Sequence, residues 1–461
     1  MAAAEQGSGD ADHRRRGVAV LVPYPFQGHL TPMLQLGSVL HNRGFSILIA
    51  HTQFNSPNPK NHPNFLFHAL SDGGLSSSRG GSIPPEKFFA TMQENCRASL
   101  EKFLARRLEK QHGKDDEEMI KCVIYDNNMF FAREVAARLD IPSIVLRPHC
   151  AAILQHIALA LTHGSGEDDK PQDESWTFQR DAKSLQYLQN LYDAYPSVAC
   201  IWNTADCLDH SVLAQQPHQR PDATKTPFFA IGPLHKLAPP DFSSSCSLHE
   251  EDSACLAWLD THPPRSVVYV SCGSLPLDGG KEVTEMAWGL ANCDHPFLWA
   301  LLPSSSQGTV EDLMPEGFRE KVGERGKLVR WAPQKAVLGH PSVAVYLTHA
   351  GWGSAMESIC GGVPMICRPI YADQFVNSQH LSREVKVGVE LEEGAERGGV
   401  ERAIRKVMGK EGEEVRERVA ELKREIDDAV GEGGSSRRAL DELVHFIDDA
   451  LIPSSPLPLP T

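Results

Sequence analysis

The chain has 461 residues, of which 41% are hydrophobic, so it is long enough for more than one domain with a buried core. Asp and Glu number 60 against 45 Lys and Arg, and the net charge of −15 argues against nucleic acid or an anionic membrane as main partner. The eleven cysteines form no CxxC pair and the histidines show no HExxH spacing, so we expect reduced thiols and no metal site.

The two ends of the chain are predicted to be disordered. Residues 1–16 are small, polar and charged, and residues 452–461 are rich in proline and serine. Three arginines before the apolar run Val18–Val22 are typical of a signal peptide, but the run is short and Pro23 ends it. No apolar run reaches the ~18 residues that a membrane helix needs. We therefore expect a cytoplasmic protein that does not bind membranes.

A βαβ unit opens the first half of the chain. Val18–Val22 reads as a buried strand, and residues 23–29 as a loop. Thr31 is expected to cap a helix with Pro32 at its first position, and Phe45–Ala50 is the next strand. His29 then stands at the carboxyl end of the first strand, where open α/β sheets bind ligands. From the residues alone, a capping or packing histidine is the simpler interpretation.

Polar residues also follow two later strands. Asp126 comes directly after the apolar run Ile120–Tyr125, and His149 and Cys150 come soon after Ile144–Leu146. A carboxylate at a strand end is usually a turn or N-cap residue. A histidine paired with a carboxylate, however, can accept a proton from a hydroxyl group while the carboxylate fixes its tautomer.

The second half begins after a linker rich in proline, serine and charge, Pro239–Ser253. Ser266–Val270 is a predicted strand that leads into a turn ending at Ser274. Further elements are expected at residues 281–292 (helix), 296–301 (strand), 377–384 (helix), 387–391 (strand), 411–430 (amphipathic helix) and 435–450 (last helix).

The stretch Trp331–Gln374 carries most of the chemical specialisation. An indole at a strand end, as at Trp331, can stack on a flat base. The strand Val343–Thr348 leads through a glycine-rich turn, His349–Ser354, into a helix, and the free N–H groups and dipole of a helix N-terminus favour an anion. A further strand, Val363–Cys367, is followed by Asp373 and Gln374.

This stretch resembles, nearly position for position, the signature box of plant family-1 glycosyltransferases, which move a sugar from a UDP-sugar onto small molecules. The loop Gln27–His29 resembles the family's loop that carries the general base, and Asp126 matches the aspartate that pairs with it. Ser274 matches the family's diphosphate-binding loop. The resemblance extends from about residue 17 to about residue 450.

The resemblance implies an α/β fold of the GT-B architecture, in which two Rossmann-like parallel-sheet domains face each other across a cleft. It also implies a monomer that binds UDP-sugar and a small acceptor. The expected division of the chain is 17–238 for the acceptor domain, 239–255 for the linker, 256–434 for the UDP-sugar domain and 435–451 for a helix that crosses back to the first domain.

The implied reaction is transfer of glucose with inversion, with UDP-glucose as co-substrate and neither metal nor cofactor. His29 would be the base and Asp126 its partner. Glucose rather than galactose is implied by Trp352 and Gln374. The implied UDP-sugar site comprises Ser274, Trp331, Ala332, Gln334, His349, Gly351, Trp352, Gly353, Ser354, Glu357, Asp373 and Gln374. The implied acceptor site includes Phe26, His149 and Cys150, and a structural role is an equal alternative for the last two.

Two features of the sequence qualify this hypothesis. Residues His51–Pro63 resemble a plant subgroup that glucosylates cytokinins, benzoxazinoids or diterpenoids. The family has asparagine where this chain has Gly353, and the amide of that asparagine helps to hold phosphate. The alternative function is therefore a sugar-nucleotide-binding protein with weak or no turnover.

Overall fold

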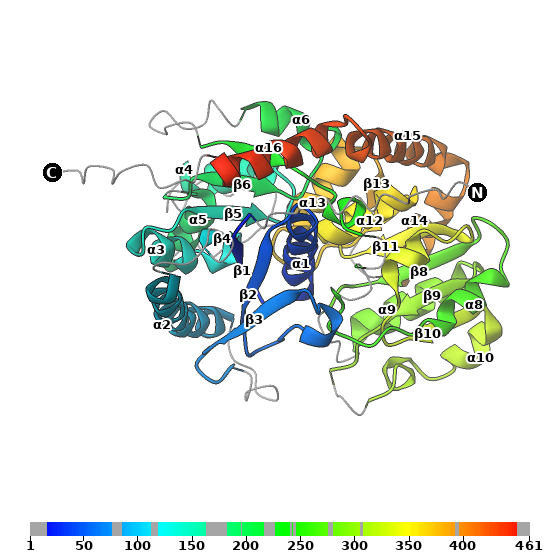
Figure 1. Cartoon of the computed structure of the whole chain (residues 1–461). Coiled ribbons are helices and arrows are strands. Elements are labelled where there is room, and N and C mark those ends of the chain that lie inside the picture. The colour runs from blue at the N-terminus through cyan, green and yellow to red at the C-terminus, as the bar shows by residue number, and fades with distance from the viewer. Residues whose placement is uncertain are drawn as a thin grey trace, which may run out of the picture.

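Two parallel β-sheets, each covered by helices, form the two halves of the molecule (Figure 1). The structure, a computed structural model, describes residues 16–75, 85–111, 119–162, 182–194, 196–215, 226–239, 242, 246–274, 280–304, 308–391 and 396–449. The expected disordered ends thus lie outside the described residues, apart from Arg16.

The first sheet has seven parallel strands in the order β3-β2-β1-β4-β5-β6-β7. Strand β1 is apolar and buried throughout, and β5 is buried throughout, as expected for a sheet covered on both faces. The strands are β1 (Val18–Val22), β2 (Ser46–Thr52), β3 (Phe65–Leu70), β4 (Ile120–Asp126), β5 (Ser143–Arg147), β6 (Ala199–Trp202) and β7 (Phe228–Ala230).

The second sheet has six parallel strands in the order β10-β9-β8-β11-β12-β13. Val267, Val345 and Leu347 are among its fully buried residues. The strands are β8 (Val267–Ser271), β9 (Phe297–Ala300), β10 (Gly326–Val329), β11 (Val343–Thr348), β12 (Met365–Cys367) and β13 (Gly388–Glu390).

Helices connect these strands and cover both sheets (Figure 1). With the first sheet go α1 (Gln27–His41), α2 (Pro85–Gln111), α3 (Phe131–Arg138), α4 (Ile153–Thr162), α5 (Ala182–Tyr192), α6 (Asp206–Gln215) and α7 (Leu234–Leu237). With the second go α8 (Ala254–Asp260), α9 (Lys281–Asn292), α10 (Phe318–Val322), α11 (Gln334–Leu338), α12 (Trp352–Gly361), α13 (Gln374–Gln379), α14 (Arg397–Met408) and α15 (Glu413–Val430).

The order of strands reverses direction at corresponding points of the two sheets. β1 lies between β2 and β4, and β8 lies between β9 and β11. Connections on either side of such a point leave in opposite directions and open a crevice at the carboxyl ends of the strands. His29 and Asp126 lie at the crevice of the first sheet, and Ser274 and His349 at that of the second.

The last helix, α16 (Ser435–Asp449), returns to the first domain (Figure 1). The Ser436 hydroxyl donates to the carbonyl of Gly232 at 2.7 Å, and Phe446 packs on Phe229. An ion pair joins Asp448 to Arg16. Four apolar residues of α16 belong to the core under the first sheet: Leu440, Leu443, Val444 and Ile447.

Most of the expected elements are present, with shifts of one to three residues at their ends. One difference affects the site. The helix expected to begin at Pro32 begins at Gln27, so His29 lies in its first turn rather than in a loop. Proline favours the first position of a helix, but here the helix continues through it and lacks only the hydrogen bond that proline cannot donate.

Candidate functional site

His29 and Asp126 are brought together although they lie on different elements. Nδ1 of His29 is 2.9 Å from Oδ2 of Asp126, and the carboxylate is fully buried. The other carboxylate oxygen accepts from the backbone N–H of Asn128 at 2.9 Å. The carboxylate therefore holds a proton on Nδ1 and leaves Nε2 of His29 as the basic nitrogen.

The charge around His29 favours its protonated form. Burial by itself would lower the pKa of His29, but the charge and hydrogen bond of Asp126 raise it above the ordinary value of 6.5, and the charge of Asp373 adds to this. Asp373 comes from the second domain, and burial raises its own pKa. The two domains thus both act on the electrostatics of this histidine.

Aromatic and amide side chains surround the His29–Asp126 pair. The ring of Tyr24 meets that of His29 edge-on at 5.1 Å between centroids. The hydroxyl of Tyr187 donates to Oδ1 of Asn128 at 2.6 Å, which turns the amide nitrogen of Asn128 toward Asp126. Tyr187 lies on α5, so a helix far along the chain supports the pair.

The three residues expected in an acceptor site have different surroundings. Phe26 is half-buried, and its ring lies 5.0–6.0 Å from three others, those of Tyr24, Phe54 and Phe88. His149 is buried against Trp202, and burial with the charge of Arg147 lowers its pKa to about 3. Cys150 is fully buried, and its thiol belongs to a packed hydrophobic cluster. A role of these residues in acceptor binding stays a prediction.

A pocket of about 440 Å³ lies between the two domains. Gln27, Gly28 and Gln35 line it from α1, and Gly273 lines it from the second domain. Eight of the residues expected to bind UDP-sugar also line it: Ser274, Trp331, Ala332, Gln334, His349, Gly353, Ser354 and Glu357. We call this the donor pocket, after the UDP-sugar that the family resemblance leads us to expect there.

The N-terminus of α12 forms one wall of the donor pocket. Gly353 and Ser354 occupy its first turn, where backbone N–H groups lack partners within the helix. The helix dipole adds partial positive charge at this point. The turn before the helix is strained, because Ala350 has φ of 63°, and Asn377 holds the Ala350 carbonyl through a 3.0 Å hydrogen bond.

The imidazole of His349 is enclosed by two glycines. A Cβ on Gly351 would lie 2.5 Å from Nε2 of His349, and a Cβ on Gly273 would lie 3.0 Å from it. Burial lowers the pKa of His349 to about 4, so the ring is neutral at neutral pH. Gly351 therefore serves the site by leaving room for His349.

A hydrogen-bond network fixes the other end of the donor pocket. Nε2 of Gln334 donates to Glu357 at 2.8 Å and to the hydroxyl of Ser354 at 2.9 Å. Its carbonyl oxygen accepts from Tyr346 at 3.0 Å. Burial raises the pKa of Glu357, and the bond from Gln334 opposes this shift. The indole of Trp331 lies beside this group, half-buried against the ring of His249.

Three residues expected to hold the sugar are not among the residues that line this pocket. The indole of Trp352 is 2% exposed and donates from Nε1 to the Asn203 carbonyl at 2.9 Å. The side-chain oxygen Oε1 of Gln374 accepts from the backbone N–H groups of Ile370 and Tyr371, in the loop before α13. Oδ2 of Asp373 accepts from Asn377 at 3.0 Å. A sugar contact by these residues stays a prediction.

Sequence reasoning missed the role of Gln27. Its Nε2 donates to the carbonyl of Cys246 at 3.0 Å, and its Oε1 accepts from the N–H of Leu248 at 2.8 Å. The linker is thereby tied to the turn that carries His29, and Ser247 and Glu251 of the linker line the donor pocket. The only indication in the sequence of a role for Gln27 was its place two residues before His29. No comparable signal points to Tyr187 or Asn203.

Comparison with known proteins decides the family. The chain is 44% identical to UDP-glycosyltransferase 76E1 of Solanum lycopersicum, over 96% of this chain and 95% of that protein. It belongs to the plant UDP-glycosyltransferases. A flavonol 3-O-glucosyltransferase of Arabidopsis thaliana, UGT76E12, is 37% identical over 94% of this chain and 97% of that protein. The family model described as UDP-glucoronosyl and UDP-glucosyl transferase matches residues 232–426.

Solved structures of this family have the same GT-B fold. UGT2 of Phytolacca americana, complexed with UDP-2-fluoro-glucose and pterostilbene, has a TM-score of 0.73 and 25% identity, and the match covers 94% of this chain and 99% of that one. The chain is therefore a glycosyltransferase with two Rossmann-like domains, as the sequence predicted. In the described part of the chain, no group of three or more His, Cys, Asp or Glu could hold a metal ion, and no helix could cross a membrane.

Proposed function

We propose that this protein transfers glucose from UDP-glucose to a hydroxyl group, or an amine, of a small plant metabolite, with inversion at the anomeric carbon. The observation that carries this proposal is the 2.9 Å contact between His29 and Asp126, next to Gln27 and Gly28, which line a pocket shared by both domains. The histidine and aspartate can activate the acceptor, and the residues of the pocket can stabilise the leaving group.

In the proposed reaction, Nε2 of His29 takes the proton of the acceptor hydroxyl as its oxygen attacks the anomeric carbon. The bond from that carbon to the UDP oxygen breaks, and UDP keeps the electron pair. Asp126 holds the imidazole in the required tautomer and stabilises the imidazolium that forms. Asp373 adds a second negative charge near the same ring.

The leaving diphosphate is proposed to lie at the N-terminus of α12. Backbone N–H groups there, with the hydroxyls of Ser274 and Ser354 and the neutral imidazole of His349, would bind its oxygens. Trp331 would stack on uracil, and Glu357 would accept hydrogen bonds from the ribose hydroxyls, with Gln334 holding its carboxylate in place.

Gly353 is the observation behind the alternative, a sugar-nucleotide-binding protein with little turnover. Glycine offers an N–H group at this position but no side-chain donor. The intact His29–Asp126 pair favours the enzyme instead, because binding alone does not require a buried carboxylate on the far nitrogen of a histidine.

The test is product formation by the purified protein with UDP-glucose and a panel of phenolic, terpenoid and cytokinin acceptors, measured by mass spectrometry, with the anomeric configuration of the product read by proton NMR. A glucoside whose anomeric configuration is opposite to that of the donor supports the proposal. Binding of UDP without product from any acceptor supports the alternative. Parallel reactions with UDP-galactose test the donor, and equal use of both sugars would contradict the glucose preference.

A further inference from the structure

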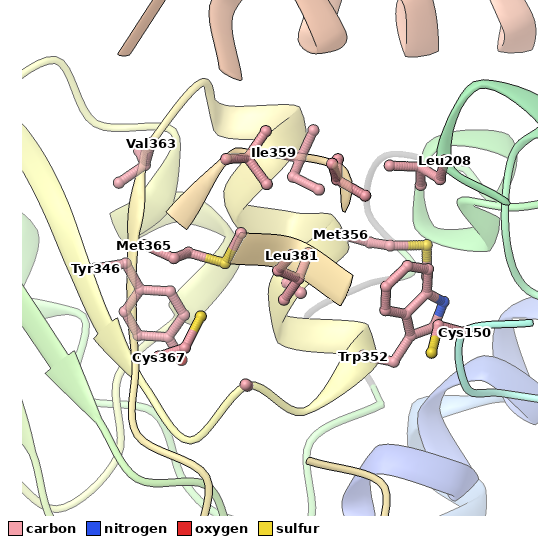
Figure 2. Close-up of a cluster of buried hydrophobic side chains, with 14 of the residues drawn as sticks. Cys150, Leu208, Tyr346, Trp352, Met356, Ile359, Val363, Met365, Cys367 and Leu381 are labelled. Carbon is pink, nitrogen blue, oxygen red and sulfur yellow. The ribbon is translucent and has the colours of Figure 1, made fainter. Parts of the chain in front are cut away.

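The indole of Trp352 makes a buried contact between the two domains. Trp352 is the first residue of α12, in the second domain, and its Nε1 donates to the backbone carbonyl of Asn203 at 2.9 Å. Asn203 directly follows β6 in the first domain and lies 149 residues away in the sequence. Figure 2 shows the indole beside Met356 of its own helix and Cys150 of the first domain.

Asn203 is itself held firmly in the first domain. Its backbone N–H donates to the carbonyl of Arg147 at 3.1 Å, and its Oδ1 accepts from the N–H of Leu234 at 3.0 Å. Asn203 is 3% exposed and also lines the donor pocket. The carbonyl that receives the indole N–H therefore has a fixed position.

A second polar contact crosses the same interface. Nε2 of His380, in the second domain, lies 3.1 Å from Oδ1 of Asp209 and 3.1 Å from the carbonyl of Leu208, both on α6 of the first domain. The other oxygen of Asp209 accepts from Ala151 and Thr204. The rings of His380 and Trp352 are 6.2 Å apart, so the two contacts are neighbours.

We propose that Trp352 is a positioning residue that holds the N-terminus of α12 at a fixed place relative to the domain that carries His29. Gly353 and Ser354, which directly follow Trp352 in the sequence, line the donor pocket from the first turn of α12. The distance from this turn to the base therefore depends on the contact between Trp352 and Asn203. In this role the indole acts on the geometry of transfer and not as a recognition surface for the sugar.

The substitution Trp352→Phe tests this inference, because phenylalanine keeps an aromatic ring and removes the N–H donor. Calorimetry measures the affinities for UDP and for UDP-glucose, and steady-state assays measure kcat. We expect kcat to fall about tenfold because the buried Asn203 carbonyl loses its partner. Any change in affinity should be the same for UDP and for UDP-glucose.

Trp299→Phe is the matched control, because Trp299 is equally buried, at 1% exposed, but lies within the second domain. A selective loss of UDP-glucose affinity with unchanged UDP affinity in Trp352→Phe would overturn the inference, since it would show direct contact with the sugar. An unchanged kcat would also overturn it.

The variant His380→Leu tests the same interface from outside the donor pocket, in case Trp352→Phe does not fold. We expect the same result: a lower kcat and an unchanged ratio of the two affinities. An unchanged kcat in this variant would contradict a positioning role for the interface. The kcat measurements rest on the proposed transfer reaction, whereas the ratio of affinities does not, so failure of the two proposals can be distinguished.

Discussion

Nδ1 of His29 lies 2.9 Å from Oδ2 of Asp126, although 97 residues separate them in the sequence. The contact exists because β1 and β4 are neighbours in the sheet, with Val22 opposite Tyr125, so the two strands end side by side. Because the carboxylate faces Nδ1 of His29, Nε2 is the nitrogen that remains basic.

Replacing His29 with alanine should abolish transfer to hydroxyl acceptors and leave UDP affinity nearly unchanged, because the imidazole is the proposed base and does not line the donor pocket. Steady-state rates and calorimetry with UDP measure the two effects. His41→Ala, at the other end of α1, is the control. Near-normal turnover in His29→Ala would refute the assignment.

Asp126→Asn should lower kcat severely but leave more residual activity than His29→Ala. The imidazole remains in this variant, but asparagine can no longer fix its tautomer or stabilise its charged form. The comparison requires both variants to be assayed with the same acceptor. Equal activity of Asp126→Asn and the unmodified protein would show that the carboxylate has only a structural role.

The pH dependence follows from the raised pKa of His29. The base is active when neutral, so kcat/KM should rise with pH through a pKa above 6.5. Asp126 is the main cause that raises this pKa, so the Asp126→Asn variant should show the acid limb at lower pH. The measurement is kcat/KM as a function of pH for the unmodified protein and for Asp126→Asn, with an acceptor that does not itself titrate in this pH range. A limb at the same pH in both would contradict this account.

The raised pKa of His29 also affects stability. A group with a raised pKa in the folded state stabilises the fold fully below its unfolded pKa, near 6.5, and this contribution is lost as pH rises through the folded value. At pH values above the pKa of His29 in the folded protein, the imidazole is neutral and can act as a base. In that same pH range its contribution to the free energy of unfolding has been lost.

Gly351→Ala should weaken UDP binding, because the new Cβ would lie 2.5 Å from Nε2 of His349 and would displace the imidazole. We expect a loss of about tenfold in affinity, the value of one hydrogen bond to a charged group. Gly339→Ala is the control, since its Cβ would meet its nearest atom at an ordinary 3.4 Å. Unchanged affinity in Gly351→Ala would show that His349 does not contact the diphosphate.

Gly353→Asn should tighten UDP-glucose binding or raise turnover without changing the range of acceptors. A Cβ at Gly353 would meet no atom within 4 Å, so the larger side chain fits. A neutral donor to a charged phosphate contributes about 1.5–3 kcal/mol, or roughly tenfold to a hundredfold. Calorimetry and steady-state rates compare the two proteins. No improvement would mean that another group already takes the place of the missing amide.

The sequence predicted the parts of the site that follow directly from strand ends. β1, β4, β8 and β11 are largely apolar runs, and the polar residues that follow or end them lie at the crevice of their own sheet. The family resemblance then selected His29, Asp126 and the residues of the donor pocket from many polar residues. Local pattern and resemblance together selected these residues, and their roles in catalysis and binding stay predictions.

Side-chain directions and long-range contacts were not predictable in this way. Whether the indole of Trp352 faces the sugar or Asn203 depends on how two domains pack, and no local pattern records that. The helix α2 was also missed, although Met92, Cys96, Leu100 and Leu104 recur every four residues along its buried face.

The return of α16 to the first domain has a consequence for how the chain folds as it is made. The core beneath the first sheet contains residues near the start of the chain, such as Ala19, together with Leu443 and Ile447 near its end. A ribosome synthesises those last residues after the whole second domain. The first domain therefore cannot complete its core during translation, and an N-terminal fragment expressed without α16 would expose the apolar surface that this helix covers.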